Sequence, residues 1–196
     1  MNLRILLIPL LFISLLSNVY AQQKSDKKQD FPIHLSILDE STSLPNFWFL
    51  RYAYNPAFIV GTEYTLTHDW HLTGNLGFFY RKEWQTAVFL LPEIGYRRHL
   101  NRWSFYPRLG LGYTHSFVAR PVYKFEGTQF QEVSNLGSPF LTGSLSLNLS
   151  YQLKDQERSP EIYCSFMMMA LVPFNNWAGL HQLVGVGYKF YPFKND

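Results

Sequence analysis

Apolar and polar residues alternate along the chain between Trp103 and Phe117. Every second residue from Trp103 is apolar or aromatic until His115, and the residues between them are mostly small or polar. Successive side chains of a β-strand point to opposite faces. The segment therefore predicts a long strand with an apolar face that is aromatic near both ends, and a polar face that carries Arg108.

The same alternation recurs along the chain, in segments separated by turn residues. Together with Trp103–Phe117, these segments predict eight strands, and Ile33–Leu38 is an alternative for the first of them. Pro92 predicts a bulge or local irregularity in the fourth strand. The orientation of the seventh stays open because Phe166–Met169 is apolar on both faces. The other seven segments are 46–54, 57–67, 70–80, 85–98, 140–153, 161–172 and 180–191.

The strand lengths fit a membrane. Ten steps of ~3.3 Å from Trp70 to Tyr80, tilted by ~45°, rise roughly 23 Å, close to the apolar band of about 25 Å on known barrels. Among sheets, only a closed barrel satisfies every backbone group in hydrocarbon. A secreted β-sandwich or lipocalin-like barrel also alternates, but its outer face would be polar. We therefore predict an all-β, eight-stranded antiparallel up-and-down transmembrane β-barrel. Aromatic residues expected at its two membrane interfaces are Trp70, Tyr80, Trp103 and Phe117.

The N-terminus predicts export. Arg4 precedes an apolar run over Ile5–Leu16, and Val19 and Ala21 supply the small residues of a cleavage site. A retained membrane anchor is the alternative, but the run is short for a spanning helix. The expected organisation is a signal peptide over 1–21, a periplasmic leader over 22–44 and an outer-membrane barrel over 45–196.

Charge and cysteine content exclude several classes. The chain has 17 Lys and Arg against 14 Asp and Glu, a net charge of +3 that becomes +2 when Arg4 leaves with the signal peptide (16 − 14). No basic cluster follows the lysines of the leader, so we expect no nucleic-acid partner. The single cysteine, Cys164, cannot form an intramolecular disulfide.

The C-terminal segment Gly185–Phe190 resembles the signal by which outer-membrane barrels are recognised for insertion, with Tyr188 and Phe190 three and five positions after Gly185. That resemblance implies the barrel-assembly machinery as a partner during insertion. Segments 55–64, 92–97 and 109–113 are similar to segments of small, uncharacterised outer-membrane β-barrel proteins of Gram-negative bacteria. The resemblance implies a fold and a location, but no activity.

Charged residues share the inward parity of the predicted strands. A charge facing lipid at the midplane would cost about 2–4 kcal/mol, so the register places these residues in the lumen. The interior of an eight-stranded barrel is just wide enough to be filled by side chains. We therefore predict a plug of paired charges, with a narrow polar conduit as the alternative. The residues are Arg51, Glu63, Glu93, Arg97, Arg108 and Lys189.

An enzyme is a second functional class to consider. Thr114-His115-Ser116, with Glu126 in the following loop, supplies a base, a hydroxyl and a carboxylate like those of a lipid A deacylase. Adjacent residues of a strand face opposite sides, which favours an interfacial histidine instead. The sequence shows neither metal-ligand spacing nor a glycine-rich phosphate loop, so we expect no metal or cofactor.

The sequence favours a structural or surface-binding role. The expected partners are outer-membrane lipid and an extracellular ligand held by the longest loop, 119–138. A membrane-lipid-modifying enzyme and a narrow small-solute channel remain the alternatives.

Overall fold

The computed structural model describes residues 31–41, 54–82, 84–127, 129–154, 158–174 and 177–192. The signal peptide expected over 1–21 lies outside these residues, as does Arg51. Over the described residues the regular structure is all β, and no helix there is long and apolar enough to cross a membrane. The strands are β1 (Ile33–Ser41), β2 (Pro56–Thr65), β3 (Trp70–Arg81), β4 (Gln85–Tyr96), β5 (Arg98–Leu100), β6 (Trp103–Val118), β7 (Val122–Glu126), β8 (Gln129–Val133), β9 (Ser138–Gln152), β10 (Glu161–Phe174) and β11 (Trp177–Phe190).

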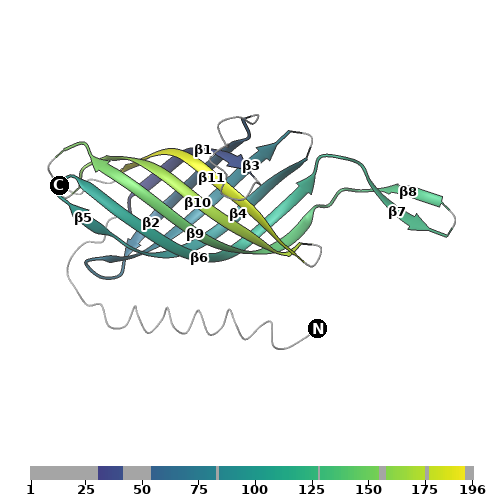
Figure 1. Ribbon diagram of the computed structural model, residues 1–196, viewed down its shortest axis with the longest axis horizontal. Helices are drawn as coiled ribbons and strands as arrows, with labels where there is room; N and C mark the ends of the chain where they lie inside the picture. The colour runs from purple at the N-terminus through teal and green to yellow at the C-terminus, as the bar shows by residue number, and fades with distance from the viewer. Residues whose placement is uncertain are drawn as a thin grey trace, which may run out of the picture.

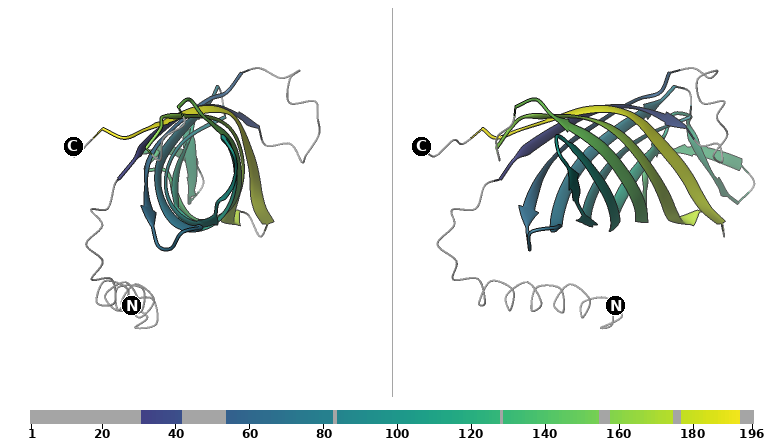
Figure 2. Two further views of the ribbon diagram at one scale, coloured as in Figure 1. Left: turned by 90° about the vertical axis from the view of Figure 1, so that its left-hand side faces the viewer. Right: turned by 60° about the vertical axis from the view of Figure 1, so that its left-hand side comes forward.

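Nine of these strands form one sheet that closes on itself, as Figure 2 shows end-on. The sheet closes where β1 pairs antiparallel with β11, from Ile33 opposite Phe190 to Ser41 opposite Gln182. Short β5 continues β4 along β6 in the same register, so the two count as one wall position. The predicted all-β, eight-stranded antiparallel barrel is confirmed.

The irregularity at Pro92 is a gap in the ladder. Gln85 pairs with Val118 and Gly95 with Arg108, so the register of β4 against β6 is the same on both sides of the proline. Pairing is absent only at residues 91 and 92. Proline has no N–H to donate, which removes a ladder bond without inserting an extra residue.

The expected start of the barrel at residue 45 is wrong. The alternative first strand is the one that forms, because β1 begins at Ile33 and pairs with both β2 and β11. Its side chains alternate as a barrel wall requires, with His34, Ser36 and Leu38 buried. Residues 33–41 therefore belong to the barrel rather than to a leader. Of the expected strand 46–54, only Tyr54 is described, and it is not in a strand.

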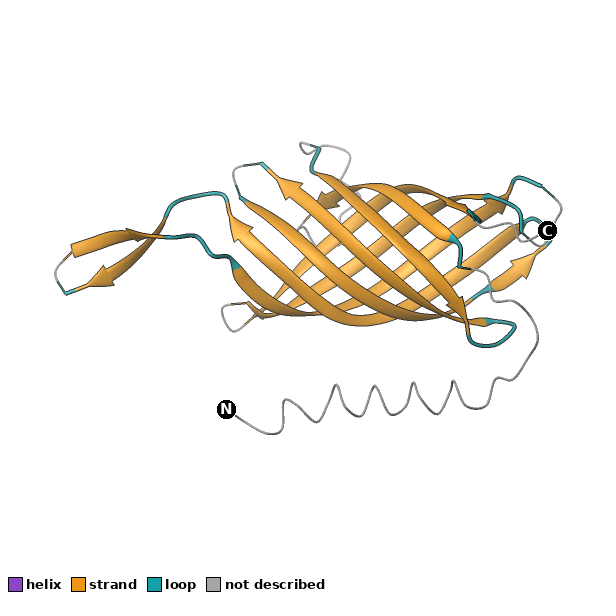
Figure 3. Cartoon of the chain, turned by 180° about the vertical axis from the view of Figure 1, so that it is seen from behind, coloured by secondary structure: helices purple, strands orange, loops and turns teal. Residues whose placement is uncertain are grey.

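The two ends of the barrel differ in their connections. At one end, here called the turn end, lie the links 66–69 and 101–102, the end of β9, the start of β10 and both ends of the described chain. The other end, here called the loop end, holds the ends of β1, β3, β6 and β10 and the starts of β2, β4, β9 and β11. The β7–β8 hairpin projects from the loop end (Figures 1 and 3).

The walls alternate as the sequence predicts. Along β6, the side chains of Trp103, Leu109 and Leu111 are exposed outside, whereas Ser104 and Arg108 are buried inside. The structure also settles β10, whose orientation the sequence left open. Its odd-numbered residues from 161 to 171 are buried, and the side chains between them, including that of Cys164, face outward.

Candidate functional site

The lumen is divided into two halves of different chemistry. The half nearer the turn end holds ionisable side chains, all buried: His34, Glu63, His71, Glu93, Arg97, Arg108, Glu161 and Lys189. The half nearer the loop end is packed mainly with apolar side chains: Leu38, Ala57, Ile59, Phe79, Ala87, Phe89, Leu91, Met167, Met169, Leu171 and Leu183.

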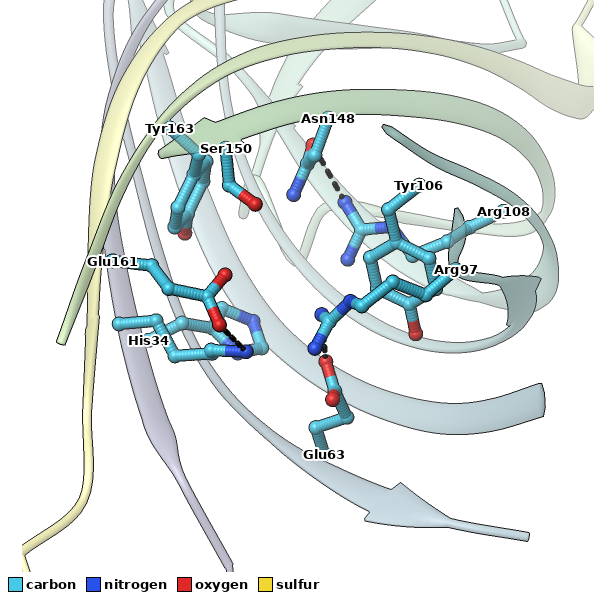
Figure 4. A pocket seen from close by; sticks show the side chains of 10 residues that line it. His34, Glu63, Arg97, Tyr106, Arg108, Asn148, Ser150, Glu161 and Tyr163 are labelled. Atoms are coloured by element: carbon cyan, nitrogen blue, oxygen red, sulfur yellow. Dashed lines mark hydrogen bonds and ion pairs between the residues drawn. The ribbon is translucent and has the colours of Figure 1, made fainter. Parts of the chain in front are cut away.

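Glu63 of β2 is held by two neighbours at the turn end. Arg97 Nη2 donates to Glu63 Oε2 at 2.6 Å, and His71 Nδ1 lies 3.3 Å from Glu63 Oε1. The Arg97 guanidinium also lies over the ring of Tyr106, with its Cζ atom 4.3 Å from the ring centre (Figure 4). Thr73 of β3 bonds the Tyr106 hydroxyl at 2.9 Å. This cluster joins side chains from several walls across the lumen.

Glu93 of β4 is the most highly coordinated carboxylate. Its Oε2 atom accepts from Asn75 Nδ2 at 2.9 Å and lies 3.2 Å from Arg108 Nη1. Its Oε1 atom accepts from the hydroxyls of Ser144 and Ser146 at 2.8 and 2.6 Å. These contacts connect β4 to side chains of β3, β6 and β9, so the Glu93 carboxylate links four walls of the barrel.

A third pair links the last two strands. Lys189 Nζ lies 2.6 Å from Glu161 Oε1, and both side chains are buried. Five of the six residues expected in the lumen therefore lie there and form ion pairs. Arg108 pairs with Glu93, and Arg97 pairs with Glu63. The sequence missed Glu161 because the apolar residues on both faces of its strand concealed which side faces inward.

The remaining space among these side chains is small. A cavity of about 20 Å³ is lined by ten residues that include Arg97, Arg108 and Lys189 (Figure 4). That volume holds about one water molecule. This cavity is therefore too small for a solute larger than a water molecule.

A hydrogen-bonded histidine and glutamate lie among the apolar residues near the loop end. His181 Nδ1 contacts Glu40 Oε1 at 2.7 Å, and both side chains are almost fully buried. The His181 ring also packs on Phe79, with ring centres 5.1 Å apart. The pair connects β11 to β1 at the closing seam.

The candidate catalytic residues of β6 are not brought together. His115 faces outward, where its Nδ1 atom contacts the Tyr113 hydroxyl at 2.8 Å and its Nε2 atom contacts the Leu136 carbonyl oxygen at 2.9 Å. Nε2 is the donor in the second contact, because a carbonyl oxygen only accepts. Ser116 is buried on the opposite face. The side chain of Glu126 is outside the described atoms.

The four expected interfacial aromatics all have their rings exposed on the outer face. Trp70 and Trp103 lie near the turn end, and Tyr80 and Phe117 lie near the loop end. Trp70 packs edge-on against Tyr96 at 5.6 Å between ring centres. The two levels of aromatics border the outward apolar faces of the strands.

The residues of the C-terminal segment lie in β11, at the seam with β1. Tyr188 and Phe190 stack on the outer face with ring centres 5.8 Å apart. A Cβ atom on Gly185 would overlap the carbonyl oxygen of Ile37 and lie 2.7 Å from Leu38 Cα. Only glycine permits this close approach of the two backbones.

The β7–β8 hairpin carries aromatic side chains on one face. Phe125 pairs with Phe130 across the hairpin, with ring centres 5.1 Å apart, and Tyr123 lies on the same face opposite Glu132. The rings are 60%, 72% and 57% exposed for Phe125, Phe130 and Tyr123. These three residues are called the aromatic face below. The sequence led us to expect a loop that binds an extracellular ligand in this connection, but it did not predict the hairpin.

Within the described residues, no group of three or more His, Cys, Asp and Glu side chains could hold a metal ion. In the first turn, outside the barrel wall, His68 Nδ1 lies 2.8 Å from Asp69 Oδ1. This hydrogen bond lowers the pKa of the Asp69 carboxyl below its usual value. Both side chains reach solvent, so the pair contributes little to stability.

These features define a closed eight-stranded antiparallel barrel with a filled lumen and outward apolar faces, a fold found in outer-membrane barrel proteins. The structure is similar to that of Neisserial surface protein A, with a TM-score of 0.57 at 9% identity over 83% of this chain and 96% of that one. The outer-membrane protein Ail of Yersinia pestis gives 0.46 at 15% identity, over 83% of this chain and all of Ail (100%). The N-terminal barrel domain of Pseudomonas aeruginosa OprF gives 0.45 at 11% identity, over 83% and 100%.

No protein-family model matches the sequence, and no curated protein matches it. The structural likeness therefore concerns the fold.

Proposed function

We propose that the protein is an exported, integral outer-membrane barrel that conducts no solute and binds an extracellular macromolecule through its β7–β8 hairpin. The outward apolar faces and their aromatic borders support residence in a membrane. The longest connection between neighbouring strands of the barrel, from Val118 to Ser138, leaves from the loop end, which supports an orientation with the loop end outside the cell. Insertion by the barrel-assembly machinery is part of the same proposal.

The aromatic face of the hairpin is the observation that carries the binding role. Tyr123, Phe125 and Phe130 expose large apolar rings on a ribbon that projects beyond the barrel (Figure 1). Burying such rings against a partner releases apolar surface from water, and aromatic residues are enriched at protein interfaces. A purely structural barrel has no physical need for this exposed surface.

The binding role is tested with intact cells that display the protein. Wild-type cells should attach to immobilised collagen, laminin, fibronectin or mucin more than cells lacking the protein. Replacing Tyr123, Phe125 and Phe130 together by serine should abolish the difference while surface display is unchanged. Substituting Gln129 and Gln131, exposed on the opposite face of β8, is the matched control. Attachment by wild-type cells equal to that of cells without the protein would refute the proposal.

The filled lumen supports the absence of conduction. The cavity among the charged side chains is only about 20 Å³, and apolar side chains pack the half of the lumen beyond it. Purified protein in planar bilayers should give no single-channel steps. Reproducible steps would overturn this part of the proposal and favour the small-solute channel.

Action on membrane lipid receives less support. His115 and Ser116 face opposite sides of the wall, and both ring nitrogens of His115 already have hydrogen-bond partners. Mass spectrometry of outer-membrane lipid from cells with and without the protein would show a change only if the enzyme alternative holds.

A further inference from the structure

Three basic side chains gather at the loop end, on two neighbouring connections. Arg81 ends β3, Lys82 follows it, and Arg120 lies just after β6. The backbone fastens these connections together, because Ala119 N donates to the carbonyl oxygen of Trp84 at 3.0 Å. Trp84 N also donates to the Arg81 carbonyl oxygen at 3.1 Å. The cations are therefore held on a defined rim rather than scattered.

An aromatic ring is part of the same rim. The Arg81 guanidinium lies over the indole of Trp84, with its Cζ atom 5.2 Å from the ring centre. Trp84 is 64% exposed, and the side chains of Lys82 and Arg120 are exposed as well. Arg81, Lys82, Trp84 and Arg120 are called the basic rim below.

The outer wall directly beneath the basic rim is apolar and aromatic. Tyr80 pairs with Thr86, and Thr86 pairs with Phe117, so the two rings lie at one level on either side of Thr86. Both rings are exposed outward. An amphipathic molecule standing against this wall would place its apolar chains beside the rings and its head group beside the cations.

We propose that the basic rim binds the phosphate groups of a phosphorylated glycolipid in the outer leaflet. Arg and Lys form charge-assisted hydrogen bonds to phosphate, and Arg can do so with two parallel donors. Three cations on two connections match a head group with more than one phosphate. The inference rests on the proposed outward orientation of the loop end.

The test compares lipid binding by the folded barrel and its variants in detergent, using native mass spectrometry. The probe is bisphosphorylated lipid A, with dephosphorylated lipid A and phosphatidylglycerol as separate arms. The test variant carries Arg81→Gln, Lys82→Gln and Arg120→Gln. The control variant carries Arg98→Gln and Lys154→Gln, which remove exposed cations from the turn end.

Wild-type protein should bind the bisphosphorylated lipid more tightly than either other lipid. A basic side chain near a charged membrane surface contributes a factor of roughly five to affinity, so the triple variant should bind roughly a hundredfold more weakly. The turn-end control should bind like the wild type. Equal binding by the triple variant, or equal binding of dephosphorylated lipid A, would overturn the proposal. Preference for phosphatidylglycerol would overturn the glycolipid assignment.

Two further variants separate this proposal from its alternatives. The mobility of unheated protein in SDS gels shows whether the triple variant is folded. If it is not, the single charge reversal Arg120→Glu, at an exposed position, provides the test and should weaken binding of lipid A. Serine substitution of the aromatic face should leave binding of lipid A unchanged. Loss of cell attachment with retained lipid binding would therefore leave the rim proposal intact, and the reverse result would refute the rim alone.

Discussion

Neutralising one member of the Glu93–Arg108 pair should destabilise the barrel strongly. Glu93→Gln removes the negative charge, while Arg108 stays buried in the lumen with Asn148 Oδ1, 3.1 Å from its Nη2 atom, as a neutral partner. Removing one partner of a buried ion pair costs about 3–5 kcal/mol, because the other charge is left uncompensated away from water. We expect a loss of this size in the free energy of unfolding.

The double variant Glu93→Gln with Arg108→Gln makes the reasoning sharper. Both charges are then absent, so the penalty for an unpaired buried charge disappears. The double variant should be more stable than the sum of the two single losses predicts, by about 2 kcal/mol or more. This coupling distinguishes an ion pair from two independent polar contacts.

The assay is reversible urea unfolding in lipid vesicles, followed by the fluorescence of the tryptophans. Asp69→Asn serves as the control, because it neutralises a carboxylate that reaches solvent beside His68 and should leave the unfolding midpoint nearly unchanged. Single losses that simply add in the double variant, within about 0.5 kcal/mol, would refute the electrostatic account of the lumen.

Three other predictions address the wall and its orientation. Gly185→Ala should destabilise the barrel by about 1–3 kcal/mol, because the new Cβ atom would overlap the backbone of β1. Gly74→Ala is the control and should not destabilise it, because no atom lies within 4 Å of that Cβ position. Similar unfolding midpoints for the two variants would refute the seam geometry. Cys164 faces outward from the barrel wall, so a charged maleimide should label it only after the protein in vesicles is denatured. A cysteine introduced by Ser134→Cys, in the connection between β6 and β9, should react at once. Rapid labelling of Cys164 would show that this side chain is in contact with water. Trypsin added to intact cells should cut after Lys124, in the connection between β6 and β9, and protection of this bond would argue against the proposed orientation.

The sequence predicted the walls well where alternation was strict. Along Trp103–Phe117 every outward and inward assignment agrees with the structure, because a period of two leaves a single register with charges inside. Glu161 was missed because Met167 and Met169 face inward while Phe166 and Met168 face outward, so hydrophobicity could not distinguish the faces. His181 precedes Lys189 by an even number of residues in the same strand. The inward orientation predicted for Lys189 therefore implies that His181 faces the lumen as well.

The start of the barrel could not be read from alternation alone. Both Ile33–Leu38 and 46–54 alternate, and the choice between them depends on pairing with the last strand, which is a long-range property. The separation of the lumen into charged and apolar halves was also missed. It arises from the relative stagger of all the walls, which local patterns do not encode.

The seam between β1 and β11 has a consequence for the biogenesis of the barrel. Glu40 and His181 meet there although 141 positions separate them along the chain. Until the C-terminal strand is available, the nascent sheet keeps two unpaired edges, and neither edge is tolerated in hydrocarbon. Closure of the barrel therefore depends on β11, so a polypeptide that lacks this strand cannot form a stable membrane-spanning sheet. A frameshift late in the coding sequence would be as damaging as one near its beginning.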